Sequence, residues 1–133
     1  MSIKKTAGMA RQASLRLAAA TTEQKNKALE AVRTALLANA DAIIAANAAD
    51  MAQAKKDNLA APLLKRLKFD QAKIDSVCEG IESLTRLDDP VGHTLTATEL
   101  DAGLELYKVS CPIGVIGVIF ESRPDALVQI STL

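Results

Sequence analysis

The sequence predicts an α/β fold in which a helical N-terminal layer leads through a β-hairpin into the first strand of a parallel sheet. Up to about residue 88, apolar side chains recur at helical spacing. Residues 94–110 then alternate polar and apolar side chains around a turn at Asp101–Gly103, which is a hairpin pattern. Residues 115–120 form a short β-branched run, which is typical of a strand buried on both faces.

The first part of the helical layer divides into three predicted helices. Ser2 can cap the first helix, and Thr21 with Gln24 forms a capping-box pattern for the second. Asn39–Asp41 can break or re-cap that second helix, because Asn and Asp side chains compete for backbone hydrogen bonds. The alanine-rich continuation is expected to stay helical until Asp57–Asn58.

Two shorter helices complete the layer. Pro62 begins one of them, at a position that proline tolerates, and this helix is expected to end at Leu67. Asp70 caps the other. Its apolar residues recur at spacings of three and four: Ile74, Val77, Ile81 and Leu84. Pro90 and Gly92 end the helical region, which we place at residues 1–92.

Residues 93–111 form the predicted β-hairpin. The alternation in its second strand is imperfect, because Leu104 and Leu106 share a face with Lys108. Such a ribbon needs a neighbour for stability. Residues 112–133 then read as the first half of a βα unit, in which the buried strand is followed by a polar turn and by a helix that starts at Pro124.

Composition excludes several classes of protein. Sixteen basic residues balance sixteen acidic ones, and the chain has one Tyr, two Phe and no Trp, which argues against nucleic acid as a partner. The apolar runs are too short to span a bilayer, and no signal-peptide pattern is present, so no membrane partner and a cytoplasmic location are expected. His93 stands alone, which predicts no metal site.

The polar turn Glu121–Ser122–Arg123 is the main candidate for a functional site, because ligands of open α/β sheets lie outside the carboxyl ends of the strands. The planar fork of Arg123 suits a phosphate or carboxylate. Ser122 and the backbone N–H groups of the following helix can receive an anion. The structural alternative is that Glu121 pairs with Arg123 or a neighbour and that Pro124 only starts the helix.

Three further features have mainly structural interpretations. Cys78 lies on a predicted helix and is expected to be a packing residue. Cys111 has no activating group near it in the sequence except Lys108, so a catalytic role is not expected, and two cysteines make no disulfide framework. A basic cluster is expected to be a solvated face, with attraction of a phosphorylated ligand as the alternative. It comprises Lys55, Lys56, Lys65, Arg66 and Lys68.

Three motifs resemble the γ-glutamyl phosphate reductase family, which belongs to the aldehyde dehydrogenase superfamily. They are residues 112–126 (PIGVIGVIFESRPDA), 86–92 (RLDDPVG) and 103–112 (GLELYKVSCP). The Phe-Glu-Ser-Arg-Pro part is the most specific. The resemblance implies an aldehyde dehydrogenase-like fold, in which residues 112–133 begin a Rossmann-like nucleotide-binding domain. It also implies that the chain is the front part of a longer protein.

The same resemblance implies an NADPH-dependent oxidoreductase of proline biosynthesis, which reduces L-glutamyl 5-phosphate to L-glutamate 5-semialdehyde and releases phosphate. Phe120, Glu121 and Ser122 are then expected to bind the NADPH, and Arg123 the substrate. The nucleophilic cysteine is expected downstream, so this segment has no catalytic residue and is predicted to be inactive alone. A homo-oligomer formed through the hairpin is also implied.

Where this chain has Glu121–Ser122–Arg123, the wider superfamily usually carries Pro-Trp-Asn, so the oxyanion role of that Asn is not transferred to any residue. Two alternatives remain open. The chain can belong to another superfamily member that acts on a different aldehyde or acyl phosphate, or it can be a non-catalytic helical interaction module with a pairing hairpin.

Overall fold

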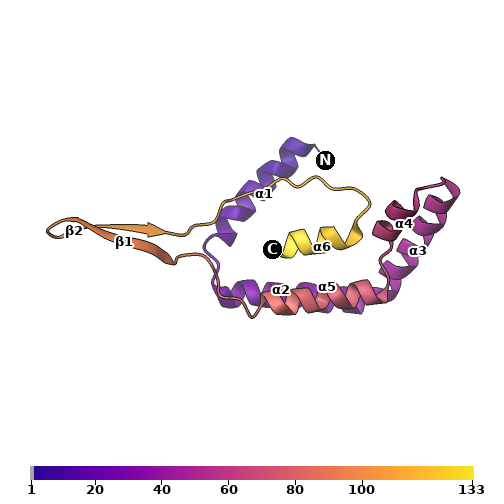
Figure 1. The fold of residues 1–133 in the computed structure, drawn as a ribbon, viewed down its shortest axis with the longest axis horizontal. Coiled ribbons are helices and arrows are strands. Elements are labelled where there is room, and N and C mark those ends of the chain that lie inside the picture. The colour runs from indigo at the N-terminus through magenta and orange to yellow at the C-terminus, as the bar shows by residue number, and fades with distance from the viewer. Residues whose placement is uncertain (1) are drawn as a thin grey trace. The chain divides into compact units, whose positions relative to one another are not determined.

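The computed structural model describes residues 2–133, which form six helices and two strands (Figure 1). In chain order they are α1 (Ile3–Leu17), α2 (Thr22–Ala38), α3 (Ala40–Lys56), α4 (Ala61–Leu67), α5 (Gln71–Leu84), β1 (Thr94–Asp101), β2 (Leu104–Val109) and α6 (Pro124–Thr132). They belong to two compact units. The first unit combines residues up to Thr22 with Asp88–Gly117, and the second combines Glu23–Leu87 with Val118–Leu133.

The helix boundaries follow the polar side chains at their ends. Ser2 Oγ accepts a hydrogen bond from the Lys5 amide at 3.4 Å, and Asp70 Oδ1 accepts one from the Lys73 amide at 3.3 Å, so both predicted caps are confirmed. Asn39 separates α2 from α3, and its side-chain amide donates to the Ala35 carbonyl at 2.8 Å. The predicted break at this asparagine is therefore confirmed as well.

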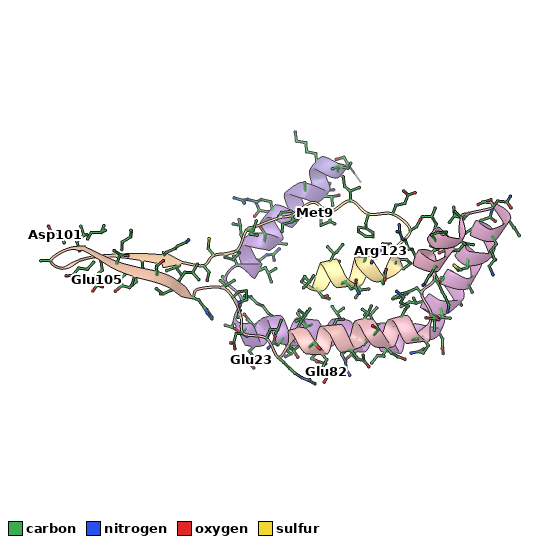
Figure 2. All side chains as sticks on the ribbon, in the orientation of Figure 1. Met9, Glu23, Glu82, Asp101, Glu105 and Arg123 are labelled. Carbon is green, nitrogen blue, oxygen red and sulfur yellow. The ribbon has the colours of Figure 1, made fainter. Side chains whose placement is uncertain are left out.

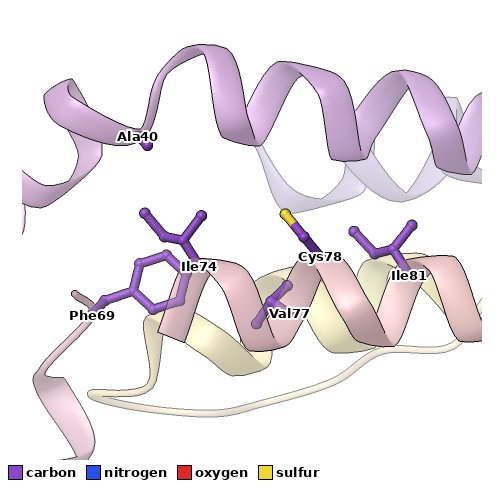
Figure 3. Close-up of a cluster of buried hydrophobic side chains, with 6 residues drawn as sticks. All are labelled: Ala40, Phe69, Ile74, Val77, Cys78 and Ile81. Carbon is purple, nitrogen blue, oxygen red and sulfur yellow. The ribbon is translucent and has the colours of Figure 1, made fainter. Parts of the chain in front are cut away.

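The core of the second unit is centred on α5 (Figure 3). Ile74 and Ile81 are fully buried. Figure 3 shows both projecting from the side of α5 that also carries Cys78. The other buried members of this cluster are Ala40, Phe69 and Val77, and partly buried residues from α2, α3 and α6 pack against it: Leu29, Leu36, Ile43, Ile44 and Val128. The spacing of apolar residues in α5 thus predicted the buried face correctly.

A buried amide fixes the link between α4 and α5. The Asn47 side chain, on α3, donates to the Leu67 carbonyl at 2.9 Å and accepts from the Phe69 amide at 2.7 Å. Asn47 itself is buried. Leu67 is the last residue of α4 and Phe69 lies in the link, so neither backbone group continues the hydrogen bonding of a helix, and the Asn47 side chain gives each of them a partner.

In the first unit, β1 and β2 pair antiparallel, as predicted. The base of the hairpin is closed by the Gly92 amide, which donates to the Ser110 carbonyl at 3.0 Å, and by the Ser110 amide, which donates to the His93 carbonyl at 2.9 Å. Every residue of both strands is exposed, and Glu99 is paired directly with Glu105, which Figure 2 labels on the hairpin. Like charges in opposed positions weaken a ribbon, so the hairpin gains little from its own side chains.

The predicted buried strand at residues 115–120 is not formed. This segment has no regular secondary structure and is exposed, with Ile119 fully and Phe120 41% accessible. A strand that is apolar on both faces needs neighbouring strands and covering helices, and the one sheet among the described residues contains only β1 and β2. The prediction of a buried strand was therefore wrong for this chain by itself, and the observed fold is a mostly helical segment with an antiparallel hairpin.

Candidate functional site

The predicted site turn leads directly into α6. Phe120 and Glu121 are exposed, and the Arg123 side chain is half-exposed at the start of the helix (Figure 2). Ser122 has a φ of 53°, which lies in the left-handed region that residues other than glycine rarely adopt. Pro124 follows at the first helical position. The turn is therefore held in an unusual backbone conformation, which is common at ligand-binding positions.

Asp125 ties this turn to α5. Its Oδ2 lies 3.0 Å from Lys73 Nζ, and its Oδ1 lies 3.7 Å from Arg123 Nε. Burial alone raises the pKa of Asp125, but the hydrogen bond and charge of Lys73, the Ala126 amide and the charge of Arg123 together lower it below the usual value. The carboxylate therefore stays ionised at neutral pH and holds Lys73 and Arg123 near each other.

These contacts decide between the structural interpretations of the turn. The ion-pair partner of Arg123 is Asp125, and no ion pair between Arg123 and Glu121 is formed. The Ala126 amide, at the start of α6, already donates to Asp125 Oδ1 at 2.9 Å and to the Arg123 carbonyl at 3.1 Å. This amide is thus occupied and does not offer the anion contact expected of the helix start.

A cleft of about 800 Å³ lies beside Arg123, within the second unit. Residues of α4, the α4–α5 link, α5 and the start of α6 line it: Pro62, Lys65, Arg66, Lys68, Asp70, Ala72, Lys73, Arg123 and Asp125. Five of these nine side chains are cationic and two are carboxylates. Its volume is in the range of small-molecule sites, and its charge favours an anionic ligand.

Sequence reasoning found these residues only in part. Arg123 was singled out by itself, and Lys65, Arg66 and Lys68 were assigned to a separate basic cluster. Three cationic side chains of that cluster line the cleft with Arg123, whereas the other two, Lys55 and Lys56, do not. Lys73 and Asp125 were missed, because an ion pair between positions 52 residues apart leaves no pattern in a sequence.

Neither cysteine is part of the cleft. Cys78 is buried in the core, and this burial is the main reason that the pKa of its thiol is raised. The charge of Arg33 lowers the pKa by a smaller amount, and that of Asp75 raises it slightly further. Cys78 is therefore a packing residue, as expected. Cys111 is exposed. Within residues 2–133, no three His, Cys, Asp or Glu side chains are grouped as metal ligands would be, and none of the helices is long and apolar enough to cross a membrane.

Comparison with known proteins gives consistent results. No protein-family model matches the chain. It is 62% identical over 133 residues to the gamma-glutamyl phosphate reductase of Acetivibrio thermocellus and 61% identical over 133 residues to that of Pelotomaculum thermopropionicum. In both cases the match covers 100% of this chain and 31% of the relative, so the chain spans about a third of the length of these curated relatives.

Two crystal structures of gamma-glutamyl phosphate reductases have the same fold over this segment. The Saccharomyces cerevisiae structure matches 99% of this chain, with a TM-score of 0.93 and 43% identity, and 34% of that structure is covered. The Thermotoga maritima structure matches 97% of this chain, with a TM-score of 0.92 and 33% identity, and 31% of it is covered. The resemblance predicted from the motifs is thereby confirmed: over its whole length, the chain is similar to the N-terminal portion of gamma-glutamyl phosphate reductases.

Proposed function

We propose that the chain forms the N-terminal part of a gamma-glutamyl phosphate reductase. Such an enzyme uses NADPH to reduce L-glutamyl 5-phosphate to L-glutamate 5-semialdehyde, with release of phosphate, in the cytoplasmic synthesis of proline. The observation that carries this proposal is the 62% identity over all 133 residues, together with the TM-score of 0.93 to a solved enzyme of that name.

The chemistry divides a difficult reduction into two easier steps. A cysteine thiolate, supplied by sequence outside this segment, attacks the acyl carbon, and the C–O bond to phosphate breaks. The departing phosphate takes up a proton and leaves as the dianion HPO₄²⁻. NADPH, when bound, would supply the hydride that reduces the thioester carbon and gives the thiohemiacetal anion. As the C=O bond of this anion re-forms, its C–S bond breaks, which releases the semialdehyde and regenerates the cysteine thiolate.

In this proposal the turn at residues 120–123 supports both ligands. Phe120 exposes an aromatic side chain, and the backbone of Ser122 is left-handed. Such a turn suits a segment whose backbone lies close to the flat nicotinamide ring. Glu121 is exposed beside them. We therefore assign these residues to contacts with the nicotinamide end of the cofactor. Residues outside this segment bind the rest of the dinucleotide. Arg123 binds an anionic group of the substrate.

The exposed apolar segment at residues 115–120 supports the same proposal. We infer that it becomes the first strand of a Rossmann-like parallel sheet once the neighbouring strands are present, so that residues 112–133 begin the nucleotide-binding domain. The helical region 1–92 and the hairpin 93–111 precede it. Burying the five apolar side chains of this segment that are now exposed would contribute about 25 cal/mol for each Å² removed from water, which favours completion of the sheet.

The test is phosphate-dependent reduction of NADP⁺ by the full-length enzyme with glutamate 5-semialdehyde, which is the reverse reaction. The proposal predicts that NADPH forms only when inorganic phosphate is added, and that residues 1–133 alone give no turnover. Oxidation of simple aldehydes at an equal rate without phosphate would instead assign the chain to another aldehyde dehydrogenase superfamily member. No turnover with any of these substrates would favour a non-catalytic helical module.

We also propose that the hairpin joins two subunits of the enzyme. All residues of its two strands are exposed, and its large apolar side chains are Leu95, Leu100, Leu104, Leu106, Tyr107 and Val109. A two-stranded ribbon with unpaired edges gains stability from a neighbouring chain. Light scattering of the full-length enzyme at micromolar concentration should therefore give at least a dimer mass, and Leu104→Lys with Leu106→Lys should lower it. A monomer mass for the unsubstituted enzyme would contradict this.

A further inference from the structure

Positively charged side chains gather at the cleft beside Arg123, although the chain as a whole has no net charge. The formal net charge of the protein is zero, yet five cationic and two anionic side chains line this one cleft. Four of the cations lie within residues 65–73, and the fold adds Arg123 from a position 50 residues after Lys73. Lys65 and Arg66 lie on α4, Lys68 in the link, Lys73 on α5, and Arg123 before α6. The fold therefore brings these charges together, and mutual repulsion alone would disperse them.

The two carboxylates of the cleft are already occupied. Asp70 forms an ion pair with Lys68 and caps α5, and the hydrogen bond from Lys68 is the main cause of its lowered pKa. Asp125 is shared by Lys73 at 3.0 Å and Arg123 at 3.7 Å. Neither carboxylate is thus left to neutralise a further cation.

Lys65 and Arg66 remain without a counter-charge. Neither forms an ion pair or side-chain hydrogen bond with any residue in the described part of the chain. Arg123 has only its long, shared contact with Asp125, which leaves most of its donors unused. Three cationic groups with unused hydrogen-bond donors therefore face the same cleft.

We propose that this cleft is a binding site for a small phosphate-bearing anion, held by Arg66 and Arg123 with Lys65 as the third cation. A phosphoryl group carries close to two negative charges and three acceptor oxygens, so it can receive donors from several directions. Arginine forks match two of these oxygens at once, and lysine adds a compact charge. Lys68 and Lys73, which are bound to Asp70 and Asp125, frame the site.

Size and composition separate this ligand from other anions. A cleft of about 800 Å³ encloses a metabolite and not a polymer. No aromatic side chain lines it, so it lacks the aromatic platform on which nucleobases usually stack. A single carboxylate would satisfy one arginine fork and leave the other cations unpaired. The phosphoryl group is therefore the anion that uses the most donors.

The binding of an anion here does not depend on the proposed reaction, but its biological identity does. If the chain is part of a gamma-glutamyl phosphate reductase, the group bound is the phosphoryl group of the substrate, and then the phosphate that leaves. The site would thereby extend the role of Arg123 to two cations of α4, Lys65 and Arg66, that the site turn alone does not include.

The direct test is titration of the ¹⁵N-labelled chain with inorganic phosphate at pH 7, with sodium chloride at matched ionic strength as the reference. We expect saturable shifts in the amides of residues 62–73 and 123–126 with phosphate and not with chloride. The double variant Lys65→Ala with Arg66→Ala should weaken the apparent affinity by about tenfold or more. Lys55→Ala with Lys56→Ala removes the same charge outside the cleft and should leave the affinity unchanged.

Three results would overturn the proposal. One is shifts that never saturate, or that both double variants reduce equally, because these report only general ionic attraction. Another is tighter binding of glutamate than of phosphate, which would make the cleft a carboxylate site. The third applies if the double variant loses amide dispersion: Arg66→Gln, which keeps most of the side-chain volume, then replaces it, and unchanged affinity for phosphate would contradict the assignment.

The full-length enzyme separates this proposal from the proposed function. In the phosphate-dependent reverse reaction, Lys65→Ala with Arg66→Ala should raise KM for phosphate about tenfold or more while KM for NADP⁺ stays unchanged. If the unsubstituted enzyme shows no phosphate-dependent activity, the proposed function fails. If it is active and the two double variants have the same KM for phosphate, the function stands and the site inference fails.

Discussion

Replacing Asn47 by Ala tests how the α4–α5 link is held. The Asn47 side chain bonds both the Leu67 carbonyl, at 2.9 Å, and the Phe69 amide, at 2.7 Å. Leu67 ends α4 and Phe69 lies in the link, on either side of Lys68, which lines the cleft. Alanine removes both partners and leaves a small cavity, so the link loses both of these hydrogen bonds to α3.

The size of the effect follows from the two groups. A buried donor or acceptor without a partner costs about 1–3 kcal/mol. The Phe69 amide is buried and should cost near the middle of that range, whereas the Leu67 carbonyl is partly buried and can bind water. We therefore expect Asn47→Ala to lower the free energy of unfolding by about 2–4 kcal/mol. With a slope of about 2 kcal/mol per molar urea, the middle of the usual range, the unfolding midpoint should fall by about 1–2 M.

Urea unfolding followed by far-UV circular dichroism measures this change, and hydrogen exchange of the Phe69 amide locates it. Gln53→Ala is the matched control, because Gln53 also lies on α3 and its side-chain amide donates to Asp57 at 2.9 Å, but at an exposed position. The control should cost less than about 0.5 kcal/mol. If both variants shift the midpoint equally, or if the Phe69 amide keeps its protection in Asn47→Ala, the Asn47 contacts do not stabilise the link.

Three further predictions concern the core, the turn and the ion pair. Ile81→Ala should lower the free energy of unfolding in urea by about 2–5 kcal/mol, because the Ile81 side chain is fully buried. Leu127→Ala, at an exposed position, should lower it by less than about 1 kcal/mol, and equal losses would place the core elsewhere. Ser122→Val should destabilise by about 1–2 kcal/mol because a β-branched side chain opposes the left-handed φ, and Ser122→Gly should be neutral or stabilising; the reverse order would contradict the assigned turn. Because the pKa of Asp125 is lowered in the folded state, ionised Asp125 stabilises the fold above about pH 4, and this stabilisation is lost as the pH falls through the folded-state pKa. The urea midpoint should therefore fall less steeply with acid in Asp125→Asn than in the unsubstituted chain. Identical slopes would show that the ion pair is not linked to stability.

The parts of the fold that the sequence predicted correctly are those set by local interactions. Ser2 and Asp70 cap helices through residues three positions away, and Asn39 ends a helix through the carbonyl four positions before it. The buried face of α5 follows from 3.6-residue periodicity alone. Each of these features depends on side chains within a few positions, so the linear pattern contains them.

The features that the sequence did not predict depend on distant partners. The run at residues 115–120 has the composition of a buried strand, but no neighbouring strand is available to pair with it among the described residues. Asn47 looked like one polar residue in an alanine-rich helix, and its two partners lie 20 and 22 positions later. The cleft likewise joins Arg123 to cations 50 or more residues earlier, which only the folded chain brings together.

The most direct test of the account is a crystal structure of the full-length enzyme with NADP⁺ and phosphate bound. We expect residues 115–120 to pair as a strand, Phe120–Ser122 to contact the nicotinamide, and the phosphate to lie within hydrogen-bond distance of Arg66 and Arg123. A nicotinamide bound away from this turn, with phosphate outside the cleft, would contradict it.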